Sequence, residues 1–307
     1  MRLMEQTTTP AETPTATQRA GFATLVGRPN VGKSTLLNRL VGAKLAAVSA
    51  KPQTTRNRIV GILNRADAQV VFVDTPGIHD AGTPFNSRMV ATARQSLGDA
   101  DVVVLVLDAR AGIGPTDRAL AAEVRTRRAL VALNKTDVVA RAALLPLCAA
   151  AAEIVPGAEI VPVSAKTGDN VERLLALTVA ALPAGPALYP ADQISEQSER
   201  FLAAEIIREK IIDQTRDEIP YATAVLIDTF REEPARNLLV IQATVLVERP
   251  TQRGILIGEQ GRRIRDIGQA ARLELEAIFG CRMFLELHAK VQHDWRKDPR
   301  ILRELGL

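Results

Sequence analysis

A glycine-rich segment near the start of the chain carries the residue types that hold phosphate groups. Gly27-Arg-Pro-Asn-Val-Gly-Lys-Ser34 fits the pattern GxxxxGK[ST] between an apolar run and a helical pattern, which is the context that the motif requires. Backbone N–H groups of such a loop curl around phosphates, and the helix that follows adds partial positive charge. Lys33 is expected to reach the β and γ phosphates, and the Ser34 hydroxyl to bind Mg²⁺. The expected nucleotide contacts here are Gly27, Asn30, Val31, Gly32, Lys33, Ser34 and Thr35.

Three shorter motifs follow later apolar runs and indicate which nucleotide is bound. Asp74-Thr-Pro-Gly77 could hold Mg²⁺ through water with its carboxylate and meet a γ-phosphate with the Gly77 amide. In Asn134-Lys-Thr-Asp137, the Asp137 carboxylate can accept both N1–H and the exocyclic amine of guanine. Adenine lacks this donor pair and would leave the buried carboxylate unpaired, at a cost of about 1–3 kcal/mol. Ser164-Ala-Lys166 would supply a backbone amide to guanine O6. The expected contacts are Asp74, Gly77, Asn134, Lys135, Asp137, Ser164, Ala165 and Lys166.

The elements that must position these motifs alternate between short apolar runs and helical stretches. Strands are expected at residues 22–26, 59–63, 70–73, 102–107, 130–133 and 160–163. Helices are expected at residues 33–41, 85–97, 116–127 and 170–182. This alternation predicts an α/β domain with a mostly parallel sheet and helices on both faces. The second and third strands are close enough in sequence to form a hairpin, so one strand should be an antiparallel edge. The four motifs then lie at the carboxyl ends of strands, where open parallel sheets bind ligands.

Three prolines and a glycine within residues 182–190 end this pattern and predict a domain boundary. Beyond it, a helix at 198–214, strands at 223–230 and 239–248, a helical pair within 258–279 and a strand at 283–291 predict a small α+β domain. The expected division is a disordered tail at 1–19, the first domain at 20–182, a linker at 183–194 and the second domain at 195–307.

The second domain contains a GxxG segment, Gly258-Glu-Gln-Gly261, expected between a strand and an amphipathic helix. That context matches a KH module, whose GxxG loop clamps a nucleic-acid backbone; a plain helix–turn–helix is the alternative. Residues 195–307 have a net charge of −1, but residues 249–272 alone hold six arginines against two acidic residues. Positive charge is therefore concentrated around the loop, as phosphate contact requires. The expected RNA contacts are Gly258, Glu259, Gln260, Gly261, Arg262, Arg263 and Arg265.

The motifs together resemble the TRAFAC-class GTPases of translation and ribosome assembly. With Arg200-Phe-Leu-Ala-Ala-Glu-Ile-Ile-Arg-Glu-Lys210 and the Met283-Phe-Leu-Glu-Leu-His-Ala-Lys-Val291 strand, the chain resembles the Era family over roughly residues 20–305. The resemblance implies a P-loop GTPase domain followed by a smaller type II KH domain, with GTP or GDP and Mg²⁺ as cofactors and slow intrinsic hydrolysis. It implies the 3′ end of 16S rRNA and the small ribosomal subunit as partners, rather than DNA, and a monomeric cytoplasmic protein. Peripheral association with the inner face of the cell membrane is attributed to the family, although the sequence contains no evident amphipathic anchor.

The same resemblance identifies a switch in the first domain. Within residues 51–58, Thr55 is expected to close onto Mg²⁺ and the γ-phosphate, with Thr54 as the alternative. Ile78 stands where Ras-like GTPases have the glutamine that orients the attacking water. Related GTPases with an apolar residue there carry an asparagine in the phosphate loop that helps to bind K⁺, and Asn30 occupies that place. We expect GTP to order these loops and so to shift the interface between the domains.

Composition excludes several other classes of protein. The 307 residues are 47% hydrophobic and 24% charged with a net charge of +4, which is typical of a soluble globular chain. The two cysteines lie too far apart in sequence for a CxxC motif, and the apolar runs are too short to span a membrane. Two alternatives remain open: a signalling or trafficking GTPase with a protein-binding second domain, and an ATP-dependent kinase or ATPase.

His288 is expected in or beside the core. Trp295 could stack on a base, but packing against the second domain is favoured.

Overall fold

A computed structural model of the chain describes residues 18–49, 51, 54–77 and 84–307. The expected disordered tail lies outside the described residues except for its last two positions. One of these, Arg19, is already the first residue of strand β1 and pairs with Ala68. Strand β1 therefore begins within the segment that was expected as a tail.

The first part of the chain forms a mixed sheet. In the described residues six strands are arranged in the order β2-β3-β1-β4-β5-β6. All neighbours pair in parallel except β2 and β3, which form the expected hairpin with Ile59 opposite Asp74 and leave β2 as an antiparallel edge. The strands are β1 (Arg19–Val26), β2 (Ile59–Asn64), β3 (Ala68–Asp74), β4 (Val102–Asp108), β5 (Ala129–Asn134) and β6 (Glu159–Pro162).

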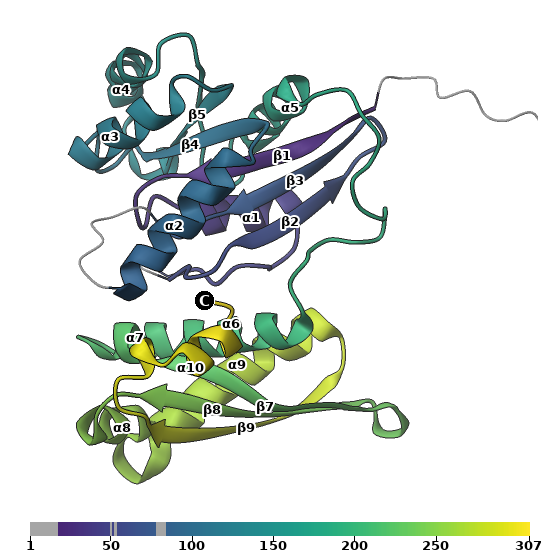
Figure 1. The fold of residues 1–307 in the computed structure, drawn as a ribbon, viewed down its shortest axis with the longest axis vertical. Coiled ribbons are helices and arrows are strands. Elements are labelled where there is room, and N and C mark those ends of the chain that lie inside the picture. Colours follow the sequence, from purple (N-terminus) through teal and green to yellow (C-terminus); the bar gives the residue numbers. More distant parts are fainter. Residues whose placement is uncertain (1–17, 50, 52–53, 78–83) are drawn as a thin grey trace, which may run out of the picture.

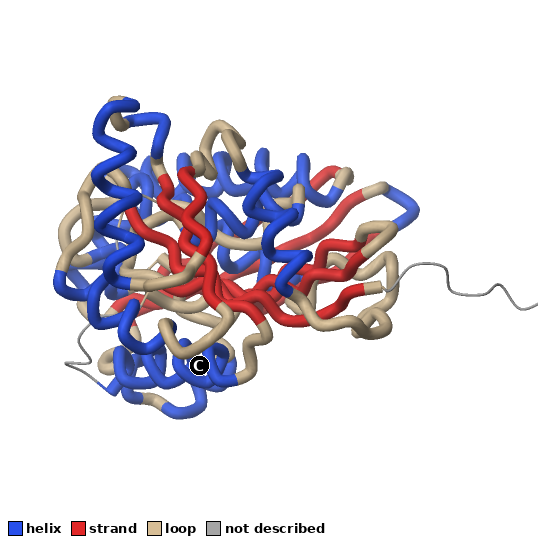
Figure 2. Tube along the Cα trace, turned by 90° about the horizontal axis from the view of Figure 1, so that it is seen from above, coloured by secondary structure: helices blue, strands red, loops and turns tan. Residues whose placement is uncertain are grey.

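Helices cover both faces of this sheet, which explains why its strands are apolar along nearly their whole length (Figures 1 and 2). One face packs against α1 and α5, and the other packs against α2, α3 and α4. The helices are α1 (Lys33–Val41), α2 (Pro84–Gly98), α3 (Pro115–Val124), α4 (Arg141–Ile154) and α5 (Val171–Ala181). The predicted α/β class is confirmed.

Helix α4 was missing from the sequence prediction. Pro146 lies inside it, and its alanine-rich sequence gives a weak amphipathic pattern, with only Ala151 fully buried. A proline within a helix costs about 3 kcal/mol or more in general. Here the helix forms because it covers strands β5 and β6, whose apolar side chains would otherwise remain exposed.

The second part of the chain is a three-stranded sheet with helices on one face. Strand β8 pairs antiparallel with β7 and parallel with β9, and the core lies between this sheet and helices α6 and α9 (Figure 1). The strands are β7 (Ala224–Glu233), β8 (Leu238–Val247) and β9 (Arg282–Val291). The helices are α6 (Glu199–Gln214), α7 (Ile219–Ala222), α8 (Pro250–Ile257), α9 (Arg262–Phe279) and α10 (Pro299–Glu304).

One detail of the predicted order was wrong. A helix, α8, rather than a strand comes directly before the GxxG segment. Pro250 stands at its first turn, where the missing N–H is not needed, and Gly258 ends it. The GxxG segment therefore joins two helices within the three-stranded α+β unit.

The segment expected as a linker follows the edge of the large sheet. The Gln69 side chain accepts from the backbone of Leu188 and Tyr189 and donates to the Tyr189 carbonyl. The Ile62 amide donates to the Ile194 carbonyl at 2.9 Å. These bonds fasten the segment to the first part of the chain; the exact domain limits remain a prediction.

Two aromatic predictions near the C-terminal end had different outcomes. Trp295 is fully buried, its indole N–H donates to the Ala222 carbonyl at 2.9 Å, and its ring meets Phe85 of α2 edge-on. It is therefore a packing residue and is not available to stack on a base. His288 was expected beside the core, but its side chain is 59% exposed because it points from β9 to the open face of the sheet.

Every helix in the described part of the chain is too short or too polar to cross a membrane.

Candidate functional site

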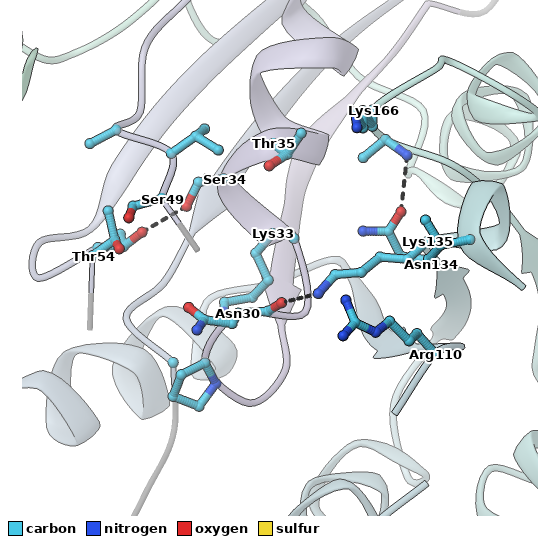
Figure 3. Close-up of a pocket in the computed structure, with 18 of the residues that line it drawn as sticks. Asn30, Lys33, Ser34, Thr35, Ser49, Thr54, Arg110, Asn134, Lys135 and Lys166 are labelled. Carbon is cyan, nitrogen blue, oxygen red and sulfur yellow. Dashed lines mark hydrogen bonds between the residues drawn. The ribbon is translucent and has the colours of Figure 1, made fainter. Parts of the chain in front are cut away.

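A cavity of about 620 Å³ opens at the carboxyl edge of the large sheet (Figure 3). It brings together residues from all the motifs that follow β1, β3, β5 and β6, together with the segment before β2. The predicted site residues that line it are Asn30, Gly32, Lys33, Ser34, Thr35, Thr54, Thr55, Gly77, Asn134, Lys135, Asp137, Ala165 and Lys166. Four other predicted residues do not line the cavity but are hydrogen-bonded to residues that do: Gly27, Val31, Asp74 and Ser164. Ile78 lies outside the described residues.

The phosphate loop is formed by the turn between β1 and α1. Gly32 adopts a left-handed conformation (φ 99°) immediately before the helix, so the first N–H groups of α1 remain free of intrahelical bonds. Lys33 is almost fully buried, and its ammonium donates to the carbonyls of Gly27 at 3.0 Å and Arg28 at 3.1 Å. Burial lowers the pKa of Lys33 to about 8, although Asp74 opposes the shift. An anionic ligand here would stabilise the charged amine.

A cluster of oxygen atoms lies beside Lys33. The Ser34 hydroxyl is 2.6 Å from Asp74 Oδ2 and 2.7 Å from the Thr55 hydroxyl. Within the described residues, the other carboxylate oxygen of Asp74 is buried without a hydrogen-bond partner. Burial raises the pKa of Asp74 above its ordinary value, while Lys33 acts in the opposite direction. Hydroxyl and carboxylate oxygens are the ligands that Mg²⁺ takes, with water completing its shell, so the residues present fit this ion.

The geometry distinguishes the two candidate threonines. Thr55 directs its hydroxyl toward Ser34 and Asp74. The Thr54 hydroxyl instead donates to the Lys51 carbonyl at 2.8 Å within its own turn. Of the two hydroxyls, that of Thr55 therefore lies in the oxygen cluster.

The opposite end of the cavity is built from two short motifs, residues 134–137 and 164–166. The Asn134 side chain donates to the Val31 carbonyl at 2.8 Å and accepts from the Ala165 amide at 2.9 Å, which ties the phosphate loop to the loop after β6. Lys135 reaches across the phosphate loop to the Asn30 carbonyl at 2.5 Å (Figure 3). The Ser164 hydroxyl donates to Asp137 Oδ1 at 2.7 Å. Asp137 is thereby oriented with acceptor capacity remaining.

Some residues of the cavity were not predicted. Arg110, Val48 and Ser49 also line it. Arg110 follows the end of β4 at the same carboxyl edge, so its position in sequence could have indicated it.

Gly77 lies so close to the phosphate loop that a Cβ atom there would be 2.7 Å from the Pro29 nitrogen, which explains the need for glycine.

The GxxG segment forms an exposed turn between α8 and α9. Gly258 has φ 72°, and a Cβ there would approach the Arg263 Cβ to 2.8 Å. Gly261 has φ 75° with open space around it. Arg262, Arg263 and Arg265 are exposed around the turn, as are Glu259 and Gln260. The guanidinium of Arg263 donates to the Ile255 carbonyl at 2.7 Å, so this side chain also fixes the end of α8.

The segment that carries Thr55 is bound to the second part of the chain. Arg208 of α6 is only 3% exposed and donates to the Thr54 carbonyl and to both oxygens of Glu205. Arg56, also buried, donates to the carbonyls of Pro220, Tyr221 and Thr223. The two residues that flank Thr55 are therefore held by the second part of the chain.

A second set of contacts connects the two parts a short distance away. Glu209 of α6 accepts from the Val48 amide at 2.7 Å and pairs with Lys44 at 2.8 Å. Lys44 also pairs with Glu274 of α9 at 3.0 Å. Helix α9 begins at the GxxG turn. This ionic cluster therefore connects the helix that follows the turn with the loop of Val48, which lines the cavity.

Comparison with known families defines the class of protein. The family described as 50S ribosome-binding GTPase matches residues 22–135, and the KH domain family matches residues 218–296. With the phosphate loop and the GxxG turn in place, the chain is a P-loop GTPase with a C-terminal KH domain.

Relatives along nearly the whole chain identify the family. The GTPase Era of Syntrophus aciditrophicus is 49% identical over 290 residues, which cover 94% of this chain and 95% of the relative. For the GTPase Era of Geobacter metallireducens the identity is 47%, with 94% and 97% covered. The solved structure of an Aquifex aeolicus Era variant bound to GDP and AlF₄⁻ has a TM-score of 0.90 at 39% identity, covering 94% of this chain and 99% of that one.

A second solved structure shows Era in complex with MgGDPNP and nucleotides 1506–1542 of 16S ribosomal RNA. It has a TM-score of 0.89 at 39% identity, with the same coverage of 94% and 99%. The chain therefore belongs to the Era family of GTPases, and it is a GTP-hydrolysing enzyme.

Proposed function

We propose that the cavity holds GTP or GDP, with the phosphates on the turn of residues 27–34 and the base between Asp137 and residues 164–166. The observation that supports this most directly is the convergence of four separate motifs on one cavity of about 620 Å³. Asp137 accepts the two donors of guanine, and one loop amide meets O6. The solved Era complex with MgGDPNP supports the same choice of nucleotide.

Mg²⁺ would be held by Ser34, Thr55 and, through water, Asp74. The ion supplies charge neutralisation between the β and γ phosphates. Lys33 leaves the carbonyls of its own loop and donates to the phosphates, so the same buried ammonium exchanges neutral acceptors for charged ones. Thr55 completes the site only when a γ-phosphate is present, which makes the segment that precedes β2 sensitive to hydrolysis.

Nucleotide choice is tested by Asp137→Asn. The asparagine amide can donate to the 2-oxygen of xanthine, so the variant should bind xanthosine diphosphate more tightly than GDP. Removing the carboxylate should weaken GDP binding by about 1–3 kcal/mol, the general cost of an unmade buried hydrogen bond. An ATP enzyme would show no change in either affinity, and that result would exclude the guanine site.

We further propose that K⁺ stimulates hydrolysis through Asn30. This residue lines the cavity beside the phosphate loop and adopts a left-handed conformation with φ 63°. Turnover should be faster in KCl than in NaCl, and Asn30→Ala should remove the difference. Equal turnover in both salts would refute this role for Asn30 while leaving GTP binding intact.

The KH domain is proposed to bind the 3′ end of 16S rRNA and to act in maturation of the small ribosomal subunit. Arginines 253, 262, 263 and 265 are exposed around a turn whose glycines let a phosphate backbone approach. The solved Era complex contains nucleotides 1506–1542 of 16S rRNA, and this chain covers 99% of that structure.

The RNA site has a matched pair of glycines for its test. Gly261 and Gly280 lie at the two ends of α9, both with positive φ (75° and 65°) and both with nothing within 4 Å of an added Cβ. Gly261→Asp and Gly280→Asp therefore impose similar backbone strain and the same charge. Only Gly261→Asp should abolish salt-dependent binding of a 3′-terminal 16S rRNA oligonucleotide. Equal binding by both variants would show that the GxxG turn does not contact RNA.

A further inference from the structure

Arg39, on the last turn of α1, holds the loop that carries Ala165 and Lys166. Its Nε donates to the Ala165 carbonyl at 3.2 Å, and its Nη2 donates to the Lys166 carbonyl at 2.5 Å. The guanidinium also lies against Gly168, where an added Cβ would be 3.8 Å from Arg39 Cζ. One planar fork thus fixes two successive peptide groups, a geometry that lysine cannot reproduce.

The same loop forms part of the cavity wall. Ala165 and Lys166 line the cavity, whereas Arg39 does not. The described peptide bonds are all trans, and in a trans peptide the C=O and the following N–H point in opposite directions. Holding the Ala165 carbonyl toward Arg39 therefore turns the Lys166 N–H away from Arg39.

The Lys166 amide is also the one that remains available. The Ala165 amide donates to the Asn134 side chain at 2.9 Å, and the Thr167 amide donates to the Ser164 hydroxyl at 3.1 Å. Among the described residues, no acceptor is bound to the Lys166 N–H. A free backbone donor on a residue that lines the cavity suits a carbonyl oxygen on the ligand.

We propose that Arg39 is a positioning residue for guanine recognition, which aligns the Lys166 amide with O6 of the base. This rests on the proposed guanine site and adds a second determinant to Asp137. Arg39 acts at position 6 of the purine, whereas Asp137 acts at N1 and the 2-amine. The two can therefore be separated by ligand chemistry.

The test compares dissociation constants of GDP, 6-thio-GDP and IDP for the wild type and Arg39→Gln. 6-Thio-GDP replaces O6 by a weaker acceptor, and IDP lacks only the 2-amine. Arg39→Gln should bind GDP about three- to tenfold more weakly, the range expected for one misaligned hydrogen bond. Its preference for GDP over 6-thio-GDP should shrink, while its preference for GDP over IDP should stay at the wild-type value. Arg39→Lys should weaken GDP binding less than Arg39→Gln does.

Arg127→Gln is the matched control. Arg127 also donates to a backbone carbonyl, that of Leu97 at 2.8 Å, but it does not line the cavity. Its substitution should leave all three affinities unchanged. If Arg39→Gln weakened all three ligands equally, Arg39 would be only a structural contact and the proposal would be refuted. A wild type with no preference for GDP over IDP would instead refute the guanine site itself.

Discussion

Replacing Arg208 by Met should selectively weaken binding of the triphosphate. Arg208 is the contact through which α6 of the KH domain holds the Thr54 carbonyl, next to the hydroxyl of Thr55. A hydrogen bond from a charged donor contributes about 1.5–3 kcal/mol, and 1.4 kcal/mol corresponds to a factor of ten. The affinity for GDPNP with Mg²⁺ should therefore fall by about 10- to 150-fold. GDP affinity should change little, because we propose that Thr55 binds the metal only beside a γ-phosphate.

Two further variants make this experiment decisive. Met at position 208 leaves the Glu205 carboxylate without its partner, and breaking such a buried pair costs about 3–5 kcal/mol of stability. The double variant Arg208→Met with Glu205→Met removes both charges, so it should recover stability in urea unfolding while triphosphate binding remains weak. Arg200→Met, on the same helix, removes a contact made within the KH domain and should leave both nucleotide affinities unchanged. An equal loss of GDP and GDPNP affinity in Arg208→Met would contradict the reasoning.

Three other expectations concern the nucleotide cavity and the packing of Trp295 against α2. Because the pKa of Lys33 is lowered to about 8 and bound phosphate raises it, GDP binding should take up nearly one proton at pH 9 and little at pH 7. Calorimetry in buffers of different ionisation enthalpy measures this uptake, and its absence at pH 9 would refute the shift. Thr55→Ala should reduce Mg²⁺-dependent GTP turnover more than Thr54→Ala does; the reverse order would assign the metal to Thr54. Trp295→Ala should lower the free energy of unfolding by about 3–5 kcal/mol in urea titrations, as for other buried aromatic residues, and a loss below 1 kcal/mol would show that the ring is not part of the core.

Local sequence patterns predicted most of the fold because each buried strand is short, apolar and followed by a turn. They failed where tertiary packing overrode the local signal. Pro146 concealed α4, which forms because it covers part of the sheet. Pro250 and Gly254 concealed α8, although a proline at the first turn starts a helix rather than breaking it.

The residues that line the cavity were predictable for a related reason. The phosphate and base motifs are contiguous in sequence, and parallel strands bring their ends to one edge. The contacts of Arg39, Arg56 and Arg208 were not predictable, since each joins residues more than 120 positions apart. No local pattern distinguishes these arginines from solvent-exposed ones. His288 shows the converse error: it was expected in or beside the core, but the alternation of side chains along β9 places it on the open face.

We expect the nucleotide bound beside Thr55 to control RNA binding by the KH domain through the contacts of Arg208, Arg56 and Glu209. Its most direct test is the dissociation constant of a 3′-terminal 16S rRNA oligonucleotide for the full chain, measured with GDPNP·Mg²⁺ and again with GDP·Mg²⁺ at one fixed salt concentration. Coupling between two sites typically amounts to a factor of about 5–150, so the two constants should differ by at least about fivefold, and Arg208→Met should bring them together. Equal affinities in the two nucleotide states of the wild type would contradict the account.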